Sequence, residues 1–553
     1  MSDPRTVIRY LGGESGHRSF FGGTHSRTRV VFLTVSVLAG MVLTPLIGWP
    51  ALAVTAGSCG VTLLVTARTH RGSIVDRRRK RFRWNHRRRT GTDTFVPYEV
   101  GAWDQLQQTL DDALTVRGKA GRQAARAADR AVTAMRANPD GSDGLGWLQH
   151  GRGEPGIAWH APIGEQPYLS VTFAVTGQLR GIESASVMAR AAHGWGVFLA
   201  VRAAPSVLVS DVQVTTRVLP SDSALQEFWV LNSLDPAAPR EAISSYEEVL
   251  RLTGTDAMVQ RHFVTVTWPL TGAFHDAAAK YGAGREGWRG LMRQEIASTA
   301  RGLGEAKMGR IDVLTARQTT ALIRHQQNPT RPLDFVADVV PERLGEASHD
   351  EYSAHVVDGT DPSTGAPVEW WHRTAAIRAE ALSTAPRTQL WVLDLLVGRD
   401  LQFIRTVSFH LHLVPAVEAK AAARQDLTRD TAEALSRREG GQVDTDDTDV
   451  QMTAARRRGQ DLVAGSHHHG ATWIGYVTIS ARTRDELARA SRQLEETCST
   501  GLGIERLDWL DSYQAAASGT TWPIGRGLRA AAPSFSSRVY TRLAGRSDKE
   551  AIS

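Results

Sequence analysis

The chain has 553 residues, of which 42% are hydrophobic and 22% are charged, which is normal for a folded protein and excludes wholesale disorder. Its only cysteines, Cys59 and Cys498, exclude a disulfide framework and a four-cysteine zinc site. The net charge is +7, but residues 68–89 alone hold eleven Arg or Lys against one acid. The basic character therefore belongs to one short segment, and the chain as a whole does not have the composition of a DNA-coating protein.

Residues 30–67 contain no charged side chain. Pro45, Gly48 and Pro50 interrupt this apolar stretch and disfavour one continuous helix. Two helices of about 17 residues, each roughly 26 Å long, are at the short end of the range that crosses a membrane. The sequence therefore predicts an N-terminal transmembrane helical hairpin, with Trp49 at the far interface.

Two other interpretations of this stretch remain open. A signal peptide would use Arg27 and Arg29 and a small-residue cleavage site at 51–53, but it would leave the apolar residues 54–67 unexplained. A hairpin buried in a core would not account for the cationic segment that follows.

The membrane-flanking cations after the apolar stretch are Arg68, Arg71, Arg77, Arg78, Arg79, Lys80 and Arg81. By the positive-inside rule they predict a multi-pass protein of the inner (plasma) membrane, with both termini and the large domain in the cytoplasm.

The basic segment also contains Phe82 and Trp84, and cations interleaved with aromatics can bind single-stranded nucleic acid. Beside a membrane span, however, each cation near an anionic leaflet adds about 1 kcal/mol of attachment to lipid. The bilayer is therefore the expected partner of this segment, and direct nucleic-acid binding is not expected.

The remaining chain alternates between strand and helix patterns, which predicts an α+β fold of sandwich-like modules similar to split βαβ units. No sequence repeat is visible. Strands are expected at 168–176, 207–219, 262–268, 368–377, 401–414 and 472–480, and Thr315 is expected to cap a helix. The expected organisation is an N-terminal segment (1–29), the hairpin (30–67), a basic juxtamembrane segment (68–97), a helical connector (98–138) with one helix over Trp103–Ala137, a first α+β module (145–345), a second α+β module (346–530) and a tail (531–553).

Chemical motifs are almost absent from the sequence. It contains no G-x-x-x-x-G-K-[ST] phosphate-binding loop, no G-x-S-x-G elbow and no H-E-x-x-H helix. The triplet His467–His469 and the strand pair His410 and His412 have ligand chemistry, but a solvated loop and core or interface packing are the favoured interpretations. No catalytic, cofactor-binding or metal-binding residue is therefore predicted.

Three segments of the second module carry a resemblance to a known family. They are RTVSFHLHLVP at 405–415, GYVTISARTRDELARASRQLEE at 475–496, and GLGIERLDWLDSYQAAASGTTWPIGRGL at 501–528. Together they resemble the N-terminal, non-catalytic domain of the conjugation ATPases of type IV secretion, the CagE/TrbE/VirB group. In that group a proline–glycine–arginine turn precedes the motor domain; here the turn is Trp522–Arg526, and 27 residues follow it.

The N-terminal hairpin resembles the two-span inner-membrane subunit that accompanies such ATPases. The whole chain is thus similar to actinobacterial integral membrane proteins of conjugative elements, in which both parts are fused and the motor is a separate polypeptide. The resemblance implies a non-enzymatic inner-membrane scaffold of a type IV-like conjugation machine. Such a scaffold would be oligomeric within a complex and would dock a separate P-loop ATPase and other channel subunits.

Residues Trp509, Trp522 and Arg526 are the candidate partner-docking residues, because the resemblance puts the junction to the motor at this end and tryptophan is enriched at interface hot spots. Core packing is the alternative role for each tryptophan. Three other functions stay open: a membrane component of type VII secretion, a membrane-tethered enzyme with an unrecognised site, and a DNA binder that uses the basic segment.

Overall fold

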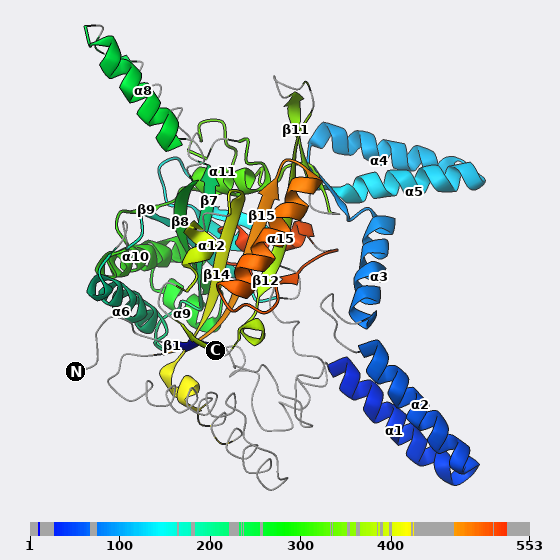
Figure 1. Ribbon diagram of the computed structural model, residues 1–553. Helices are drawn as coiled ribbons and strands as arrows, with labels where there is room; N and C mark the ends of the chain where they lie inside the picture. Colours follow the sequence, from blue (N-terminus) through cyan, green and yellow to red (C-terminus); the bar gives the residue numbers. More distant parts are fainter. Residues whose placement is uncertain are drawn as a thin grey trace.

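The computed structural model has a mixed helix and sheet fold (Figure 1). It describes residues 9–11, 27–66, 74–162, 165–178, 183–220, 237–254, 258–331, 336–350, 354–360, 367–383, 385–387, 391–397, 401–421, 469–512 and 514–527, with a few single positions between them. Its centre is one 14-stranded sheet.

The strands of this sheet follow one another in space in an order that differs from their order in sequence. From one edge to the other they are β3 (Met135–Arg136), β2 (Thr94–Pro97), β10 (Ser348–His349), β11 (Ala354–Thr360), β12 (Pro367–Ile377), β15 (Gly470–Ala481), β14 (Ile404–Val414), β7 (Asp211–Pro220), β8 (Met258–Pro269), β6 (Tyr168–Val175), β5 (Ile157–His160) and β4 (Leu145–Gln149). Two short strands, β16 (Asp508–Trp509) and β9 (Ile311–Val313), pair with β12 and β6. A separate pair is formed by β1 (Arg9–Leu11) and β13 (Ala385–Arg387).

The central sheet contains the same arrangement twice. In one half β8 lies between β6 and β7, and in the other β15 lies between β12 and β14. Each inserted strand is followed by a long helix, by a short strand that pairs with the first strand of its half, and by a second helix. The halves meet where β7 and β14 pair antiparallel, from Val218 opposite Arg405 to Asp211 opposite His412. Strands from both predicted modules therefore lie in one continuous sheet, as two split βαβ units.

One face of the sheet is apolar and is covered by helices. The first half packs against α6 (Ala185–Arg202), α9 (Gly272–Ala279) and α10 (Gly284–Glu305), around the buried residues Val171, Phe173, Val264, Val266, Phe198 and Met292. The second half packs against α12 (Leu393–Val397) and α15 (Arg484–Thr500), around Val407, Val477, Ile479, Leu487 and Leu494. Alternation along each strand places the strand residues of these two groups on a single face of the sheet.

The opposite face is polar, and it is also buried. It carries the buried residues Ser170, Thr172, Gln213, Thr215, Thr265, Thr267, Thr374, Thr406, Ser408, His410, Thr478 and Ser480. Register supports a shared face, because Thr406, Ser408 and His410 on β14 stand directly opposite Arg217, Thr215 and Gln213 on β7. The layer over this face includes α11 (Ala316–Gln327), α16 (Gln514–Ser518) and the 3-10 turn η2 (Gly519–Thr521).

Several helices project from this body (Figure 1). Two of them, α4 (Val100–Thr115) and α5 (Lys119–Ala134), pack on each other as a hairpin, where the sequence predicted one helix over 103–137. The prediction was wrong because Val116 is extended and Gly118 has a φ of +101°, which turns the chain back. The other described helices are α3 (Ile74–Thr90), α8 (Arg240–Gly254) and the 3-10 turn η1 (Ala379–Ala381).

The N-terminal hairpin consists of α1 (Arg27–Ile47) and α2 (Trp49–Thr66), which contact each other. The prediction that residues 30–67 cross a membrane is wrong: within the described part of the chain, no helix combines the length and the apolar character that a crossing requires. Helix α1 has 21 residues, begins with Arg27 and contains Pro45, and α2 has 18 residues. The transmembrane hairpin of the predicted fold class and the predicted inner-membrane location are therefore both wrong by this finding.

Candidate functional site

The polar face of the sheet binds residues 514–527, which we call the C-terminal strap. On β12, the Thr374 backbone N–H donates to Gln514 Oε1 at 2.7 Å. On β14, His410 Nε2 lies 2.7 Å from the carbonyl oxygen of Thr520, and on β15 the hydroxyls of Thr478 and Thr521 are 2.9 Å apart. The strap therefore begins over the second half of the sheet.

The strap continues across the first half, where Gln213 on β7 holds it from both sides. Its Nε2 donates to the Trp522 carbonyl at 2.8 Å, and its Oε1 accepts from the Gly525 N–H at 2.8 Å. On β6, Thr172 donates to the carbonyl of Pro523 at 3.0 Å, and Tyr168 to that of Ile524 at 3.2 Å. Buried backbone groups need such partners, so the polar sheet face is explained by the strap that it binds.

Gly525 is required for this path. Its φ is +69°, and a Cβ at this position would lie 2.3 Å from Cγ2 of Thr267. Beyond it, Arg526 forms ion pairs with Asp143 at 2.5 Å and with Glu165 at 3.4 Å, and its side chain is only 17% exposed. The strap thus leaves the sheet at a fixed point, beside the β4–β5 edge.

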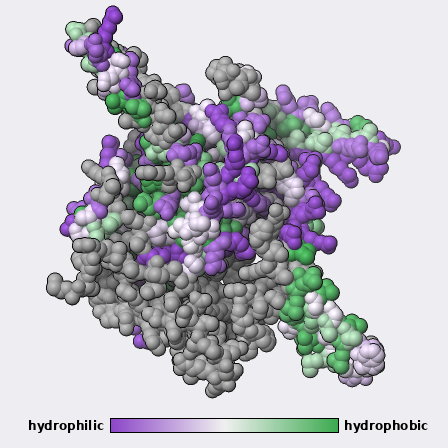
Figure 2. Space-filling model, viewed as in Figure 1, coloured by the Kyte–Doolittle hydropathy of each residue, from purple (hydrophilic) through white to green (hydrophobic). Residues whose placement is uncertain are grey.

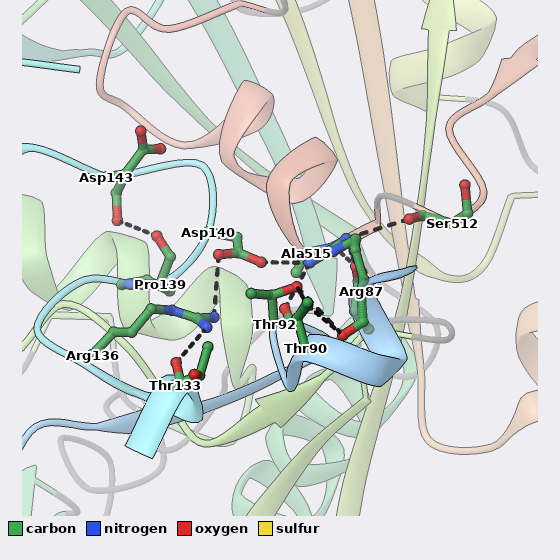
Figure 3. Close-up of polar contacts among 12 residues, drawn as sticks. Arg87, Thr90, Thr92, Thr133, Arg136, Pro139, Asp140, Asp143, Ser512 and Ala515 are labelled. Carbon is green, nitrogen blue, oxygen red and sulfur yellow. Dashed lines mark hydrogen bonds and ion pairs between the residues drawn. The ribbon is translucent and has the colours of Figure 1, made fainter. Parts of the chain in front are cut away.

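At its other end, the strap meets the basic helix α3 (Figure 3). Arg87 donates from Nη2 to Asp140 Oδ2 at 2.6 Å and from Nη1 to the Ser512 carbonyl at 3.3 Å, and it also forms an ion pair with Asp350. About two helical turns earlier on α3, Lys80 Nζ donates to the Trp509 carbonyl at 2.9 Å. These contacts join α3 to the segment that leads into the strap.

Asp350 is the most deeply buried member of this cluster, with 1% of its side chain exposed. Its Oδ1 accepts from the Ala515 N–H at 2.5 Å, so one carboxylate contacts both α3 and α16. Burial raises the pKa of Asp350 to about 7, because the charge of Arg87 and the Ala515 hydrogen bond only partly offset the loss of solvation. The junction therefore depends on Arg87 to keep this carboxylate charged.

Arg217 is a second buried charge, on β7. Its guanidinium donates to Thr406 Oγ1 at 2.8 Å and to the His325 carbonyl at 3.3 Å, while its Nε has no hydrogen-bond partner. No ion pair joins it to a residue that the structure describes, and burial lowers its pKa to about 9. Hydroxyl and carbonyl dipoles therefore stabilise the charge of the Arg217 guanidinium.

Three histidines in or beside the polar layer are buried in their neutral form. Burial lowers the pKa of His160, His325 and His372 to about 3. Each has a polar neighbour: His160 lies 2.8 Å from Ser170 Oγ, His325 lies 2.7 Å from the Arg331 carbonyl, and His372 lies 2.7 Å from the Gln327 carbonyl.

We expect these histidines to make the free energy of unfolding fall as the pH drops from about 6.5 towards 3. The unfolded chain takes up protons near pH 6.5 while the folded chain does so only near pH 3, so stability is present above the first value and lost below it. Replacing His372 with glutamine should reduce the slope of stability against pH by about one proton between pH 4.5 and 6. Urea unfolding at several pH values measures this slope, and an unchanged slope would contradict the assignment.

The structure places the predicted docking residues in the body. Trp509 is 8% exposed, donates to Glu495 Oε1 at 2.5 Å and lies under the guanidinium of Arg373. Trp522 is 2% exposed and packs with Leu145, Ile323, Leu344 and Ile524. Both indoles are therefore buried within the body in this conformation. The third predicted docking residue, Arg526, is paired with the carboxylates of Asp143 and Glu165.

The predicted flanking cations separate into two groups. Arg68 and Arg71 lie outside the described residues, whereas the other five, 77–81, lie on α3. Of the histidines noted in the sequence, His410 bonds to the strap and His412 pairs with Asp211 at 2.9 Å. Among the described residues no group of three or more His, Cys, Asp or Glu side chains is arranged to hold a metal ion.

The sequence interpretation missed Arg87, Asp350 and Gln213. One signal for Gln213 was present: apart from Arg217, the strands VQVTTRV and TVSFHLH have uncharged polar residues where a solvent-facing strand surface usually has several charged ones. Such a pattern is typical of a polar face that is itself buried. A scan against protein-family models finds no match for this chain, and no curated protein matches it.

Proposed function

We propose that the chain is a non-enzymatic scaffold of a type IV-like DNA-transfer machine and that it docks a separate P-loop ATPase. The three segments that resemble the non-motor domain of conjugation ATPases form β14, β15 with α15, and the strap with the residues leading into it. These segments are neighbours in space, because β14 pairs with β15 along its whole length and the strap bonds to both strands. Their adjacency supports the resemblance as a single structural unit.

The observation that carries the proposal is the fixed path of the strap. In the resembled ATPases the turn that corresponds to Trp522–Arg526 leads into the motor. Here the turn is held by Gln213, Thr172 and Tyr168 and ends at the Arg526 ion pairs. We therefore assign motor docking to the surface around Arg526, which includes the exposed residues Asp143, Ala161, Glu165 and Gln166.

Two further observations favour a scaffold over an enzyme. The 553 residues contain no phosphate-binding loop, which a nucleotide-driven motor needs. The dense group of buried hydroxyl, amide and imidazole side chains on the sheet is engaged in holding the strap and in bonds between strands. A polar layer used in this way leaves few of its groups for a substrate.

Site-specific photo-crosslinking tests the proposal. A photoreactive amino acid at Ala161, beside Arg526, is expected to capture a P-loop ATPase encoded next to this chain. The matched control is Ala488, another exposed alanine, on α15, which should capture much less of it. The purified chain alone should show no ATP turnover above the background of a mock purification.

Robust ATP hydrolysis by the purified chain would contradict the scaffold. Equal capture of the ATPase from both positions would contradict the assigned surface, and failure to capture any P-loop protein from either position would contradict docking itself.

A further inference from the structure

The helix α3 is unusually rich in cations and only one side of it is used to contact the body. Nine of its 17 residues are Arg or Lys. Lys80 and Arg87 bond to the body, and Trp84 between them is half-buried, so these residues at i, i+4 and i+7 define the inward face.

The outward face of α3 presents a stripe of arginines. At 100° per residue, five side chains fall within an arc of about 120°: Arg77, Arg78, Arg81, Arg88 and Arg89. All five are exposed, and no hydrogen bond or ion pair joins them to any described residue. From the first to the last the stripe is about 18 Å long.

A second stripe lies on α5. Lys119, Arg122, Arg126 and Arg130 are exposed within an arc of about 80°, on the side away from the buried Gly121 and Ala128, with Asp129 as the acid at its edge. Helix α5 contacts α3. Gly91, with a φ of +80°, brings the chain after α3 so close to Arg130 that a Cβ would lie 2.6 Å from its carbonyl oxygen.

We call the two stripes, which lie on helices that contact each other, the basic ridge: residues 77, 78, 81, 88 and 89 of α3 and 119, 122, 126 and 130 of α5. Hydrophilic residues gather over α3 and along the α4–α5 hairpin (Figure 2). Like charges close together on a helix repel one another, so each stripe destabilises the free chain, and a bound polyanion would relieve that repulsion.

We propose that the basic ridge binds single-stranded nucleic acid through its phosphates. A stripe of about 18 Å matches about five phosphates at the roughly 3.4 Å rise of a stacked strand, and arginine forms bidentate bonds with phosphate. Phe82 is 73% exposed at the edge of the α3 stripe, where it can stack on a base.

Helix α3 by itself is poorly suited to lie on an anionic lipid surface, although the adjoining α1–α2 hairpin exposes large apolar side chains. A helix that lies on a membrane buries a continuous apolar face among the headgroups. Among the described side chains of α3, Phe82 is the only exposed large apolar one, and Trp84 faces the body. The side chains of the α3 stripe therefore fit a phosphate backbone with unpaired bases, and the vesicle arm of the test below distinguishes this partner from lipid.

The test is the salt dependence of binding to a fluorescein-labelled oligo(dT) of 20 nucleotides, measured by anisotropy on the purified full chain. A variant with Arg77, Arg78, Arg81, Arg88 and Arg89 changed to glutamine should bind at least about tenfold more weakly at 100 mM salt. Its slope of log K against log salt should be smaller by about 3.5, which corresponds to five lost phosphate contacts on a single strand.

The control variant changes five other exposed arginines to glutamine, outside the ridge: Arg190, Arg293, Arg301, Arg489 and Arg492. It carries the same charge change and should keep the affinity and slope of the unmodified chain within about twofold. Thermal unfolding midpoints of both variants verify that the fold is retained.

Equal weakening in both variants would overturn the proposal, since net charge alone would then explain binding. So would binding to vesicles of phosphatidylserine without binding to the oligonucleotide, or no oligonucleotide binding at 50 mM salt. Because this assay needs no motor, its outcome is independent of the docking function.

Discussion

Replacing Arg87 with alanine is expected to lower the free energy of unfolding by about 3–5 kcal/mol, because it leaves the buried carboxylate of Asp350 without its partner. The loss should be greater at pH 8 than at pH 6. Since the pKa of Asp350 is about 7, the carboxyl is mostly neutral at the lower pH and needs no counter-charge there. Urea unfolding at both pH values measures the difference.

A double-mutant cycle separates this charge effect from simple loss of packing. Asp350→Asn removes the charge but retains an oxygen for the Ala515 N–H. We expect the double variant Arg87→Ala with Asp350→Asn to recover much of the stability at pH 8. The control Arg88→Ala, an exposed neighbour on the same helix, should cost less than about 0.5 kcal/mol. Additive effects of the two substitutions would contradict the coupling.

Replacing Trp522 with alanine is expected to cost about 3–5 kcal/mol, the usual loss when a buried aromatic residue is truncated to leave a cavity. Trp522 is 2% exposed and fills the space between Leu145, Ile323, Leu344 and Ile524, under the strap. Its removal should therefore loosen the strap as well as the core. Hydrogen exchange of the Gly525 amide, which donates to Gln213, reports on that loosening.

The matched control is Trp49, which is 79% exposed at the turn of the N-terminal hairpin. Trp49→Ala should change the free energy of unfolding by less than about 0.5 kcal/mol. A small effect of Trp522→Ala, comparable to that control, would contradict its role as a core residue and would favour the alternative role as an exposed partner anchor.

Much of the local structure was predictable from residue patterns. The alternating stretch at 168–176 predicted a strand where β6 runs from Tyr168 to Val175, and 472–480 predicted one inside β15. The N-cap prediction for Thr315 is confirmed, because Thr315 and Gln318 form a capping box at the start of α11. Such signals are local, so a single sequence contains them.

The pairing of β7 with β14 was not predictable in this way. These strands are almost two hundred residues apart, and alternation specifies a face but not a neighbour. The internal repeat has no visible sequence counterpart for the same reason, since each strand needs only apolar residues on one side and small polar residues on the other.

The site residues illustrate the same limit. Arg87 lies in a run with Arg88 and Arg89, and nothing in the sequence distinguishes the one that is buried against Asp350, 263 positions away. The membrane prediction rested on the absence of charge over residues 30–67, and within the described part of the chain no helix combines the length and the apolar character that a crossing requires.

The central claim is that a motor docks beside the end of the strap, and the affinity of the purified chain for the P-loop ATPase encoded next to it tests this most directly. Ala161→Trp places a bulky side chain on the assigned surface, while Ala488→Trp places the same group on α15. We predict that the first substitution weakens binding at least about tenfold, or about 1.4 kcal/mol, and that the second leaves it unchanged. Equal affinities for the two variants and the unmodified chain would contradict the account.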